Sequence, residues 1–549
     1  MNKKPYLAIL TLAAAAGQLL YADNDVFDNT TVTRNFINAS LVDSSWYKTT
    51  ASGVKFTGSN LTNANFNSAT LNDTDFTDTN LTNANFTKAT LTGANLSGAE
   101  IRGAKFANAT GFTSEMLCST ASYANKDLSG VYVSYVTIDG VNLEGFRVNC
   151  KFSNSSLKNI NFKDADLRGS VITRADVSGA DFTDAIINDV WMADSNFTSQ
   201  QLESTKSYKQ KDLSGVTMSY LDNISFEGKD LSGFDFSGAR FVRVNFRNAI
   251  LEDAIINDVY FSAGSADKDI TLAQVMQTKS YKDKDLSGAT FNYTVFENAD
   301  FSGFNMQRTM FDSSASNLFK NVNFTNADLR SAAGGIERGG WDTAIFKNTI
   351  LQDGSITALE MDSPDDYILV REFKYTDYIG TLYANFAEDA SISGGANLIL
   401  DNNARLMVNK AVTVNVEDGG IVSYDMDVTN TEDESYIYVL EGGDLNFAEG
   451  SKLNINVDGD LEAYTEYYKY ILYADNTSTL NSIYNDILEL CEREDVYFTN
   501  NGEELNGDWY FFEKGKWLVV SYTAVPEPAT YAAIFGALVL AFAAYRRRK

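Results

Sequence analysis

The sequence predicts an all-β fold: a solenoid of short coils followed by a second β region. Between Phe56 and Phe106 every fifth residue is large and apolar, and the residue two positions before each of them is small. A period of five fits neither an α-helix, which repeats every 3.6 residues, nor a strand, which repeats every two. It fits a coil in which each five-residue unit forms one side of a square. From about residue 357 the apolar residues alternate with a period of two instead, which is typical of ordinary strands.

Residues 1–22 have the composition of a secretory signal peptide. Lys3 and Lys4 form a basic start, and an apolar segment extends from Tyr6 to Leu20. We expect cleavage after Ala22.

The five-residue rhythm extends over residues 36–356, and in each unit the large residue and the small residue are expected to point inward. Three representative units read Ala64-Asn65-Phe66, Ala165-Asp166-Leu167 and Ala327-Asp328-Leu329. They resemble the repeat of the pentapeptide-repeat family, which reads roughly A-[DN]-[LF]-x-x. The resemblance implies a right-handed quadrilateral β-helix with four units per coil. The stability of such a solenoid is a sum over neighbouring coils.

Three similar segments interrupt the repeat, near residues 112–122, 197–207 and 270–280. Thr113, Thr198 and Thr271 suit helix N-caps, and Gln201 and Gln274 complete capping boxes. We expect three short helical insertions that bulge from the coil, each followed by a return to the coil at an Asp-Leu-Ser-Gly sequence.

Residues 357–523 form a second all-β domain in this prediction. Short alternating runs are separated by turn signals such as Gly394-Gly395 and Asp418-Gly419. We expect a wider β-helix, with a β-sandwich as the alternative. Residues 476–492 suit one helix, from Leu480 to Leu490.

The segment 525–549 carries the most specific signal for the localisation of the protein. It contains a Pro-Glu-Pro motif, the apolar run 529–545, which is just long enough to span a bilayer, and a basic end. The residues concerned are Pro526, Glu527, Pro528, Arg546, Arg547 and Arg548. The segment resembles the PEP-CTERM sorting signal. The resemblance implies export through the inner membrane of a Gram-negative bacterium, transient anchoring by a transmembrane helix over 529–545, and an exosortase-type processing enzyme. The resemblance further implies that the protein then reaches the cell surface or extracellular matrix.

The composition argues against several kinds of chemistry. The 549 residues include no His, which removes the commonest general base and the commonest metal ligand. We find no nucleophile motif, phosphate loop or calcium-binding repeat, and therefore expect no catalytic residue, cofactor or metal. The formal net charge of −29 argues against a nucleic-acid partner. Cys118, Cys150 and Cys491 show no metal-binding spacing, and Cys150 suits an apolar filler at an inward position.

Trp191 and Tyr260 are the candidate ligand-stacking residues. They occupy equivalent places in two copies of one string, Ala-Ile-Ile-Asn-Asp-Val, and each precedes an inward position, so both should point outward. A structural interpretation packs them under the neighbouring helical insertion. A functional interpretation makes them a platform on which sugar rings stack.

These observations favour an exported, non-catalytic structural or adhesive protein that displays an acidic, polar β-solenoid. The alternative is a β-helix protein that binds or acts on extracellular polysaccharide. A less favoured hypothesis is a DNA-mimicking gyrase inhibitor, because some pentapeptide-repeat proteins act in that way and the charge here is acidic.

Overall fold

The computed structural model divides the chain into two compact units, residues 1–280 and 281–549, and we describe each by itself. It describes residues 24–311, 319–334, 343–357, 360–373, 383–401, 404–427, 435–458, 466–493, 495–500, 503–504 and 507–524.

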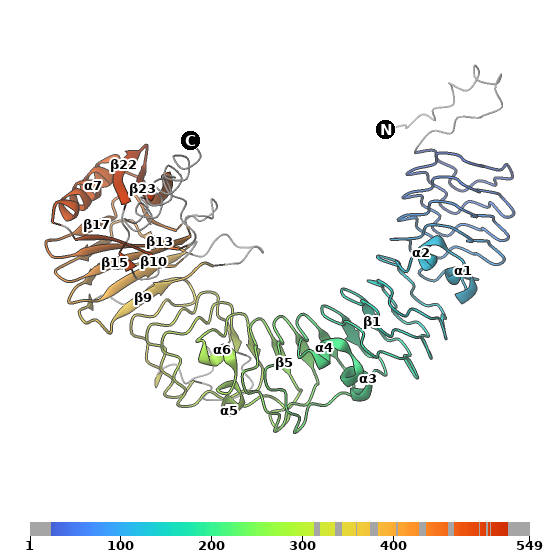
Figure 1. Cartoon of the computed structure of the whole chain (residues 1–549), viewed down its shortest axis with the longest axis horizontal. Helices are drawn as coiled ribbons and strands as arrows, with labels where there is room; N and C mark the ends of the chain where they lie inside the picture. The colour runs from blue at the N-terminus through green and yellow to red at the C-terminus, as the bar shows by residue number, and fades with distance from the viewer. Residues whose placement is uncertain are drawn as a thin grey trace, which may run out of the picture. The chain divides into compact units, whose positions relative to one another are not determined.

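The first unit is a four-sided β-helix (Figure 1). Parallel β-bridges join Ser45 to Asn65, Asn65 to Asn85 and Asn85 to Lys105. Each bridge partner lies four repeat units further along the chain. One coil therefore contains four units, and the predicted all-β solenoid is confirmed.

The interior is a ladder of the large residues that recur every fifth position. Phe66 is fully buried, and its ring centroid lies 5.0 Å from that of Phe86 with the planes only 4° apart. Ala64 and Ala84 are fully buried beside them. Burying one such phenylalanine stabilises the fold by about 1.5–3 kcal/mol, so the predicted inward positions account for the core.

The corners of the coil explain the composition of its outer surface. The residue two positions after an inward residue adopts positive φ, as at Asn63 (60°) and Asn83 (59°). Asn, Asp and Gly adopt this conformation most easily. The Asn83 amide also donates to Asn63 Oδ1 at 3.1 Å, so such outward ladders stabilise the stack.

We call the four sides of this coil faces A to D, in chain order. Parallel bridges between successive coils define them: Lys105, Tyr132, Lys151 and Val171 on face A; Thr137, Ser156 and Asp176 on face B; Asn142, Asn161 and Asp181 on face C; Asp127, Arg147 and Asp166 on face D. Face A continues in five short parallel strands, paired in the order β1 (Val171–Thr173), β2 (Trp191–Ala193), β3 (Thr217–Ser219), β4 (Arg240–Val242) and β5 (Tyr260–Ser262).

Each predicted insertion is a pair of short helices. The pairs are α1 (Ser114–Cys118) with α2 (Ala121–Ala124), α3 (Ser199–Ser204) with α4 (Lys206–Lys209), and α5 (Leu272–Val275) with α6 (Lys279–Lys282), the last of which crosses the boundary between the units. Thr113, Thr198 and Thr271 are N-caps as predicted, and the Gln201 and Gln274 capping boxes are both formed.

All three insertions lie on face C. The Gly98 amide donates to Ser119 O at 2.9 Å beside the first insertion, and the Asp184 amide donates to Ser204 O at 3.0 Å beside the second. At the third, the Asp253 amide donates to Gln277 O at 3.0 Å. Each insertion thus replaces one side of one coil, and the chain re-enters at face D.

The second unit begins with four-sided coils and continues as a three-sided β-helix. Parallel bridges join Asp285 to Asn305, Asn305 to Asp328 and Asp328 to Ile350, and β6 (Thr290–Phe291) pairs with β7 (Met310–Phe311). The strands of the wider coils are β8 (Glu360–Met361), β9 (Tyr367–Val370), β10 (Ala384–Phe386), β11 (Ala390–Ile392), β12 (Asn397–Leu400), β13 (Arg405–Val408), β14 (Thr413–Val416), β15 (Ile421–Asp427), β16 (Tyr436–Val439), β17 (Asp444–Phe447), β18 (Lys452–Asp458) and β19 (Glu466–Ala474).

Consecutive strands of the wider coils fall on three sheets in rotation. The parallel orders are β10-β13-β16-β19, β8-β11-β14-β17 and β9-β12-β15-β18-β20, the last strand being β20 (Val496–Asn500). The alternation of buried and outward residues, as in β12 and β13, follows the period of two in the sequence. The described strands between residues 360 and 500 therefore form a β-helix, and the sandwich alternative is wrong.

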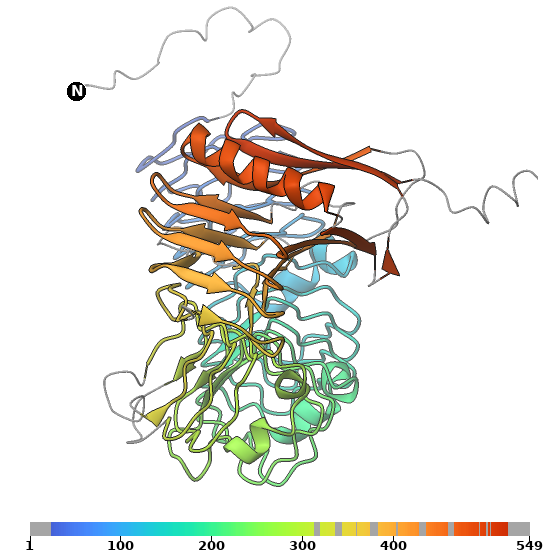
Figure 2. The same cartoon turned by 90° about the vertical axis from the view of Figure 1, so that its left-hand side faces the viewer.

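The end of this β-helix is covered by a helix and an antiparallel hairpin. Helix α7 (Thr477–Glu492) buries Leu480, Ile483, Ile487 and Leu490 and lies across the last coil (Figure 2). The final strands are β21 (Glu503–Glu504), β22 (Gly507–Lys514) and β23 (Trp517–Ala524), and β23 pairs antiparallel with both β19 and β22. Helix α7 packs against β17, the edge strand of its sheet, and so covers that edge.

The predicted signal peptide, residues 1–22, lies outside the described residues. So do the Pro526–Pro528 motif, the helix predicted over 529–545 and the arginine cluster Arg546–Arg548. Within the part of the chain that is described, no helix is both long enough and apolar enough to cross a membrane.

Candidate functional site

Trp191 and Tyr260 lie on the same ladder of face A. Trp191 in β2 is in register with Thr217 in β3, Thr217 with Arg240 in β4, and Arg240 with Tyr260 in β5. Strands spaced about 4.8 Å apart place the two aromatic residues about 14 Å from each other along the face. Both side chains point outward, as their positions in the repeat predict.

The environments of these two residues differ. Trp191 is 53% exposed, whereas Tyr260 is partly buried and has the Arg240 guanidinium carbon 3.7 Å from its ring centroid. Neither residue packs under a helical insertion, because the insertions lie on face C and β2 and β5 belong to face A. This placement argues against the structural interpretation of the pair.

Two further aromatic side chains project from the corner that follows face A. Tyr135 is 59% exposed and Tyr220 is 45% exposed. Together with Trp191 they are the exposed aromatic residues of the described span 24–280, and all three belong to units of face A. Exposed aromatic residues of this unit are thus gathered on one side of the coil.

Tyr135 and Tyr220 occupy a backbone conformation that does not suit them. Their φ angles are 58° and 53°, in the left-handed region. Asn108 and Asn154 take the corresponding corners of neighbouring coils, and asparagine tolerates this region better than tyrosine. A bulky residue held at such a site points to a requirement other than folding. The Arg243 guanidinium lies 4.6 Å from the Tyr220 ring centroid.

Face A also differs from the other faces in charge. Its five-residue units between residues 105 and 264 contain five cations and one carboxylate: Lys105, Lys151, Arg174, Arg240 and Arg243 against Asp194. The regular five-residue units of face C between residues 142 and 254 contain one cation and seven carboxylates: Lys163 against Glu144, Asp164, Asp181, Asp184, Asp230, Glu252 and Asp253. The insertion on the same face adds Glu203, Lys206 and Lys209. Because salt screens charges beyond about 8 Å, a ligand on face A meets a cationic strip on an acidic protein.

Three of the face A cations, Lys151, Arg240 and Arg243, lie beside aromatic rings, whereas Arg174 pairs with Asp194. Lys151 Nζ lies 5.9 Å from the centroid of the Tyr132 ring, and Arg174 Nε lies 3.6 Å from Asp194 Oδ2. Lys151 and Arg240 lie two rungs from Trp191 on opposite sides of it, a distance of about 10 Å each way. Face A therefore presents an exposed indole between two cationic groups.

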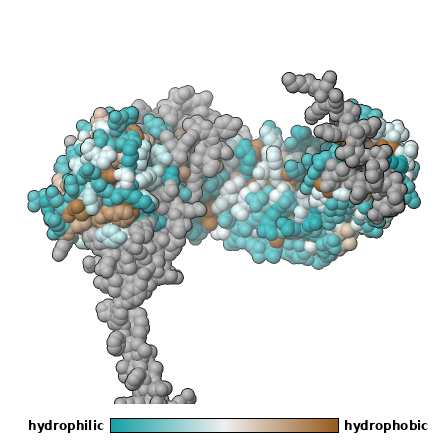
Figure 3. All heavy atoms as spheres, turned by 90° about the horizontal axis from the view of Figure 1, so that it is seen from above, coloured by the Kyte–Doolittle hydropathy of each residue, from teal (hydrophilic) through white to brown (hydrophobic). Residues whose placement is uncertain are grey.

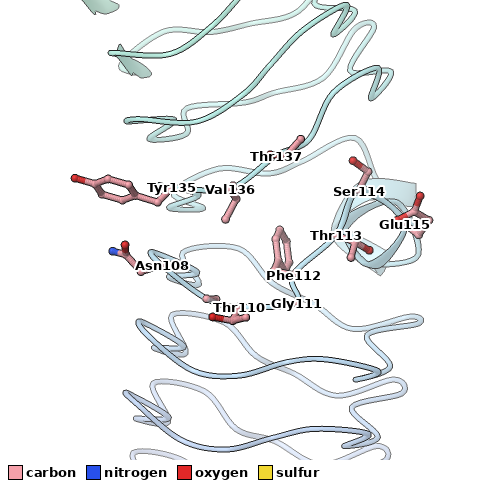
Figure 4. A pocket seen from close by; sticks show the side chains of 11 residues that line it. Asn108, Thr110, Gly111, Phe112, Thr113, Ser114, Glu115, Tyr135, Val136 and Thr137 are labelled. Atoms are coloured by element: carbon pink, nitrogen blue, oxygen red, sulfur yellow. The ribbon is translucent and has the colours of Figure 1, made fainter.

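A pocket of roughly 620 Å³ opens beside Tyr135, where the first insertion leaves the coil (Figure 4). Thr110 pairs with Thr90 below it and Thr137 with Ser156 above it, and no described bridge joins Thr110 to Thr137. Phe112 points into the gap in Figure 4, whereas Tyr135 points outward. The face B ladder is thus interrupted beside Tyr135, while the Phe112 ring is buried at this level and stacks on Phe106 at 4.3 Å.

The carboxylates of the coil have structural partners. The Thr77 hydroxyl and amide both donate to Asp75, and these hydrogen bonds, the hydroxyl first, hold the pKa of Asp75 below its ordinary value. Cys150 is buried as predicted, and burial raises the pKa of its thiol. Within the described ranges no group of three His, Cys, Asp or Glu residues is placed to hold a metal ion. Figure 3 shows hydrophilic residues over most of the visible described surface.

The fold defines a class, the repetitive parallel β-solenoids whose coils each contribute the same units. Residues 31–106 match the family described as "Pentapeptide repeat region", and residues 148–198, 219–261 and 282–313 match "Pentapeptide repeats (8 copies)". These family models match parts of the repeat region, and they support the resemblance seen in the sequence.

Several solved structures resemble the chain at low identity. One is HetL of the cyanobacterium Nostoc sp. strain PCC 7120, a pentapeptide repeat protein involved in heterocyst differentiation regulation. HetL is 22% identical to this chain, and the match covers 45% of this chain and 90% of HetL with a TM-score of 0.18. QnrB1, a plasmid-mediated fluoroquinolone resistance protein, is 17% identical, with coverage of 37% and 91% and a TM-score of 0.24. A pentapeptide repeat protein of the Arabidopsis thaliana thylakoid lumen is 19% identical, with coverage of 29% and 67% and a TM-score of 0.08. A search of curated protein sequences returned no significant match.

The sequence analysis missed Tyr135, Tyr220 and the cations of face A. The insertion between β2 and β3 makes the step from Trp191 to Thr217 longer than the usual four units, and the step from Thr217 to Arg240 is longer as well. A search that assumes exactly four units per coil assigns the residues after these points to the wrong face. Treating each insertion as one side of a coil would have restored the register.

Proposed function

We propose that this chain is an exported, non-catalytic surface or matrix protein whose face A binds an extended acidic polysaccharide. The observation that carries the proposal is the collection of exposed aromatic side chains and cations on one face of an otherwise acidic coil. Tyr and Trp offer flat, amphipathic rings for sugars. Arg and Lys pair with the carboxylate or sulfate groups that an acidic polymer carries.

The repetitive geometry of face A suits a linear polymer. Its rungs are evenly spaced at about 4.8 Å, so neighbouring sugar residues can contact successive rungs. Weak contacts made by one polymer at several places add up to a useful affinity. Tyr135, Trp191 and Tyr220 act as stacking surfaces in this arrangement, and Lys151, Arg240 and Arg243 receive the acidic groups.

Binding is tested by titrating the purified chain with polygalacturonate, and with neutral dextran for comparison. The triple variant Tyr135→Ala, Trp191→Ala and Tyr220→Ala should lose most of the affinity for polygalacturonate. Tyr497→Ala is the matched control, because Tyr497 is 40% exposed and lies in β20 of the second unit. Equal affinities of the wild type and the triple variant would refute the role of face A.

Charge is tested separately with matched reversals. Arg240→Glu with Arg243→Glu changes two cations on face A, and Lys158→Glu with Arg247→Glu changes two exposed cations on face B. We expect only the first pair to weaken binding. Single-stranded DNA is titrated as a second anionic polymer. Binding of polygalacturonate but not of DNA would show recognition of the glycan rather than a general attraction to polyanions.

The place of the protein in the cell is a separate part of the proposal. The support is the composition of residues 1–22 and the Pro526-Glu527-Pro528 motif with its apolar and basic continuation. Cell fractionation and mass spectrometry of the mature protein test it, because processing should remove residues 1–22 and the basic end. An intact, cytoplasmic chain would refute it.

The gyrase-inhibitor hypothesis ranks second. The excess of carboxylates on face C suits a mimic of duplex DNA, whereas the cations of face A oppose it. A supercoiling assay in which the purified chain leaves DNA gyrase unaffected would dismiss it.

A further inference from the structure

The second unit carries an aromatic cluster on the outer surface of the sheet that contains β13, β16, β19, β23 and β22. We call it the unit-2 platform and define it by Tyr438, Tyr470, Tyr473 and Trp517. The Trp517 ring centroid lies 4.9 Å from that of Tyr473 and 5.3 Å from that of Tyr470, both edge to face. Tyr473 stacks on Tyr438 at 4.8 Å.

These rings do not belong to the core of the β-helix. In β16 the inward residues Ile437 and Val439 are fully buried, and Tyr438 lies between them on the opposite surface of the strand. Leu518, the residue after Trp517, is likewise fully buried. Tyr470 is 38% exposed, and the other three rings are partly exposed. The platform is therefore an outward surface made by four aromatic side chains.

Two exposed lysines border the platform. Lys514 Nζ donates to Tyr470 Oη at 2.7 Å and lies 5.3 Å from the ring centroid. Lys516 Nζ lies 5.7 Å from the Tyr473 ring centroid and 3.9 Å from Asp475 Oδ1. Cationic groups next to partly exposed aromatic rings are the same combination that face A presents, built here from different strands and a different coil type.

We propose that the unit-2 platform is a second binding site for an acidic polysaccharide, so that each unit of the chain holds one polymer segment. The platform supplies ring surface for stacking, and Lys514 and Lys516 supply the charge complementary to a carboxylate or sulfate. A chain with two such sites joins separate polymer strands, or gains avidity from one strand that reaches both. The ligand class rests on the proposed function, whereas the residues are independent of face A.

The test uses the full-length chain with Lys514→Glu and Lys516→Glu, two exposed side chains whose reversal leaves the buried residues unchanged. Lys410→Glu with Lys452→Glu is the control, with the same change in net charge in the same unit but outside the platform. Urea unfolding of every variant verifies that the fold is retained. Affinity for polygalacturonate is measured by titration, and joining of strands by light scattering of mixtures.

We expect the Lys514/Lys516 variant to bind polygalacturonate at least about tenfold more weakly and to scatter no more light than the polymer alone, as loss of one of two linked sites predicts. The control should behave as the wild type. Combining the Lys514/Lys516 reversals with the triple face A variant should remove the binding that either variant retains.

The outcomes separate this inference from the proposed function. If the face A variant alone abolishes all binding, or if the Lys514/Lys516 variant binds and scatters as the wild type does, the second site is refuted and the role of face A stands. If only the Lys514/Lys516 variant loses binding, the second site stands and the role of face A is refuted. Sedimentation that shows a dimer of the free chain, lost on the Lys514/Lys516 reversal, would make the platform a contact between copies and overturn the proposal.

Discussion

The Arg240 guanidinium covers one face of the Tyr260 ring, with 3.7 Å between the guanidinium carbon and the ring centroid. The two residues are direct neighbours on adjacent rungs, β4 and β5. Trp191 lies three rungs from Tyr260 on the same ladder and is more than half exposed. Of the two aromatic residues that the sequence singles out, Trp191 therefore offers the open ring, and Tyr260 holds a cation in place.

We predict that Trp191→Ala weakens polygalacturonate binding by about 2 kcal/mol, roughly 30-fold, which is typical of the loss of a central aromatic anchor. Tyr260→Phe keeps the ring beneath Arg240 and should change the affinity less than threefold, a bound set by the ~0.6 kcal/mol that RT ln 3 represents. Isothermal titration of both variants checks the prediction. A larger loss for Tyr260→Phe than for Trp191→Ala would contradict it.

Tyr220→Gly should separate binding from folding. Glycine adopts the left-handed conformation without strain, which should raise the free energy of unfolding by about 1–2 kcal/mol. The extra chain entropy of glycine should lower it by about 0.5–1 kcal/mol. Loss of the contact with Arg243 should lower it by about 0.5–1 kcal/mol more. The free energy of unfolding should therefore change by less than about 1 kcal/mol, while the affinity falls. Asn154→Gly, at the same corner of another coil, should leave both unchanged. Strong destabilisation by Tyr220→Gly would show that the tyrosine serves the fold.

Phe66→Ala should destabilise the first unit by about 3–5 kcal/mol, because it removes a fully buried ring that stacks on Phe86 and Trp46. In a repeat solenoid the effect should be local at first, with coils near residue 66 exchanging amide hydrogens faster than coils near residue 230. Lys55→Ala, an exposed residue of the same region, should stay within about 0.5 kcal/mol of the wild type. Urea denaturation and hydrogen exchange provide the measurement, and uniform exchange along the unit would contradict it.

Acid should weaken the coil. Hydrogen bonds from the Thr77 and Thr183 side chains hold the pKa of Asp75 and of Asp181 below the unfolded value of 3.8. A carboxylate whose pKa is lower in the folded state stabilises the fold above the unfolded pKa, and this contribution is lost as the pH falls through the folded pKa. The free energy of unfolding should therefore be flat between about pH 8 and pH 5 and should fall below about pH 4.

Urea denaturation at stepped pH measures this dependence. Asp75→Asn keeps an acceptor for Thr77 but does not titrate, so its loss of stability in acid should be smaller than that of the wild type. A fold that becomes more stable below pH 4 would contradict the assignment.

Local patterns in the sequence were sufficient for most of the fold. The inward ladder containing Phe66 follows from the spacing of large residues, since burial of apolar surface outweighs the local preferences of the short strands. The N-caps Thr198 and Thr271 were found because capping depends on a few neighbouring residues. The choice between a β-helix and a sandwich after residue 357 depended on which strands pair across a whole coil, as β11 with β14 and β13 with β16 do. Alternation alone does not encode that pairing.

The candidate site was predicted only in part, for a reason of register. Trp191 stood out because its string is repeated at Tyr260, so the sequence itself marks the equivalence. Tyr135 and Tyr220 also lie in copied strings, Leu-Ser-Gly-Val-Tyr-Val-Ser-Tyr from Leu128 and Leu-Ser-Gly-Val-Thr-Met-Ser-Tyr from Leu213, but their corner position normally belongs to Asn, Asp or Gly. Their relation to Trp191 exists only after the chain is wound and the inserted helices are assigned to face C.

The position of the insertions has a practical consequence. Since each helix pair begins after face B and ends before face D, lengthening that segment adds residues without altering the order in which Lys151, Trp191 and Arg240 follow one another. The hairpins α1–α2 and α3–α4 are therefore natural places at which to attach an epitope or a fluorophore. A label attached there would leave the residues of face A, on the opposite side of the coil, unchanged.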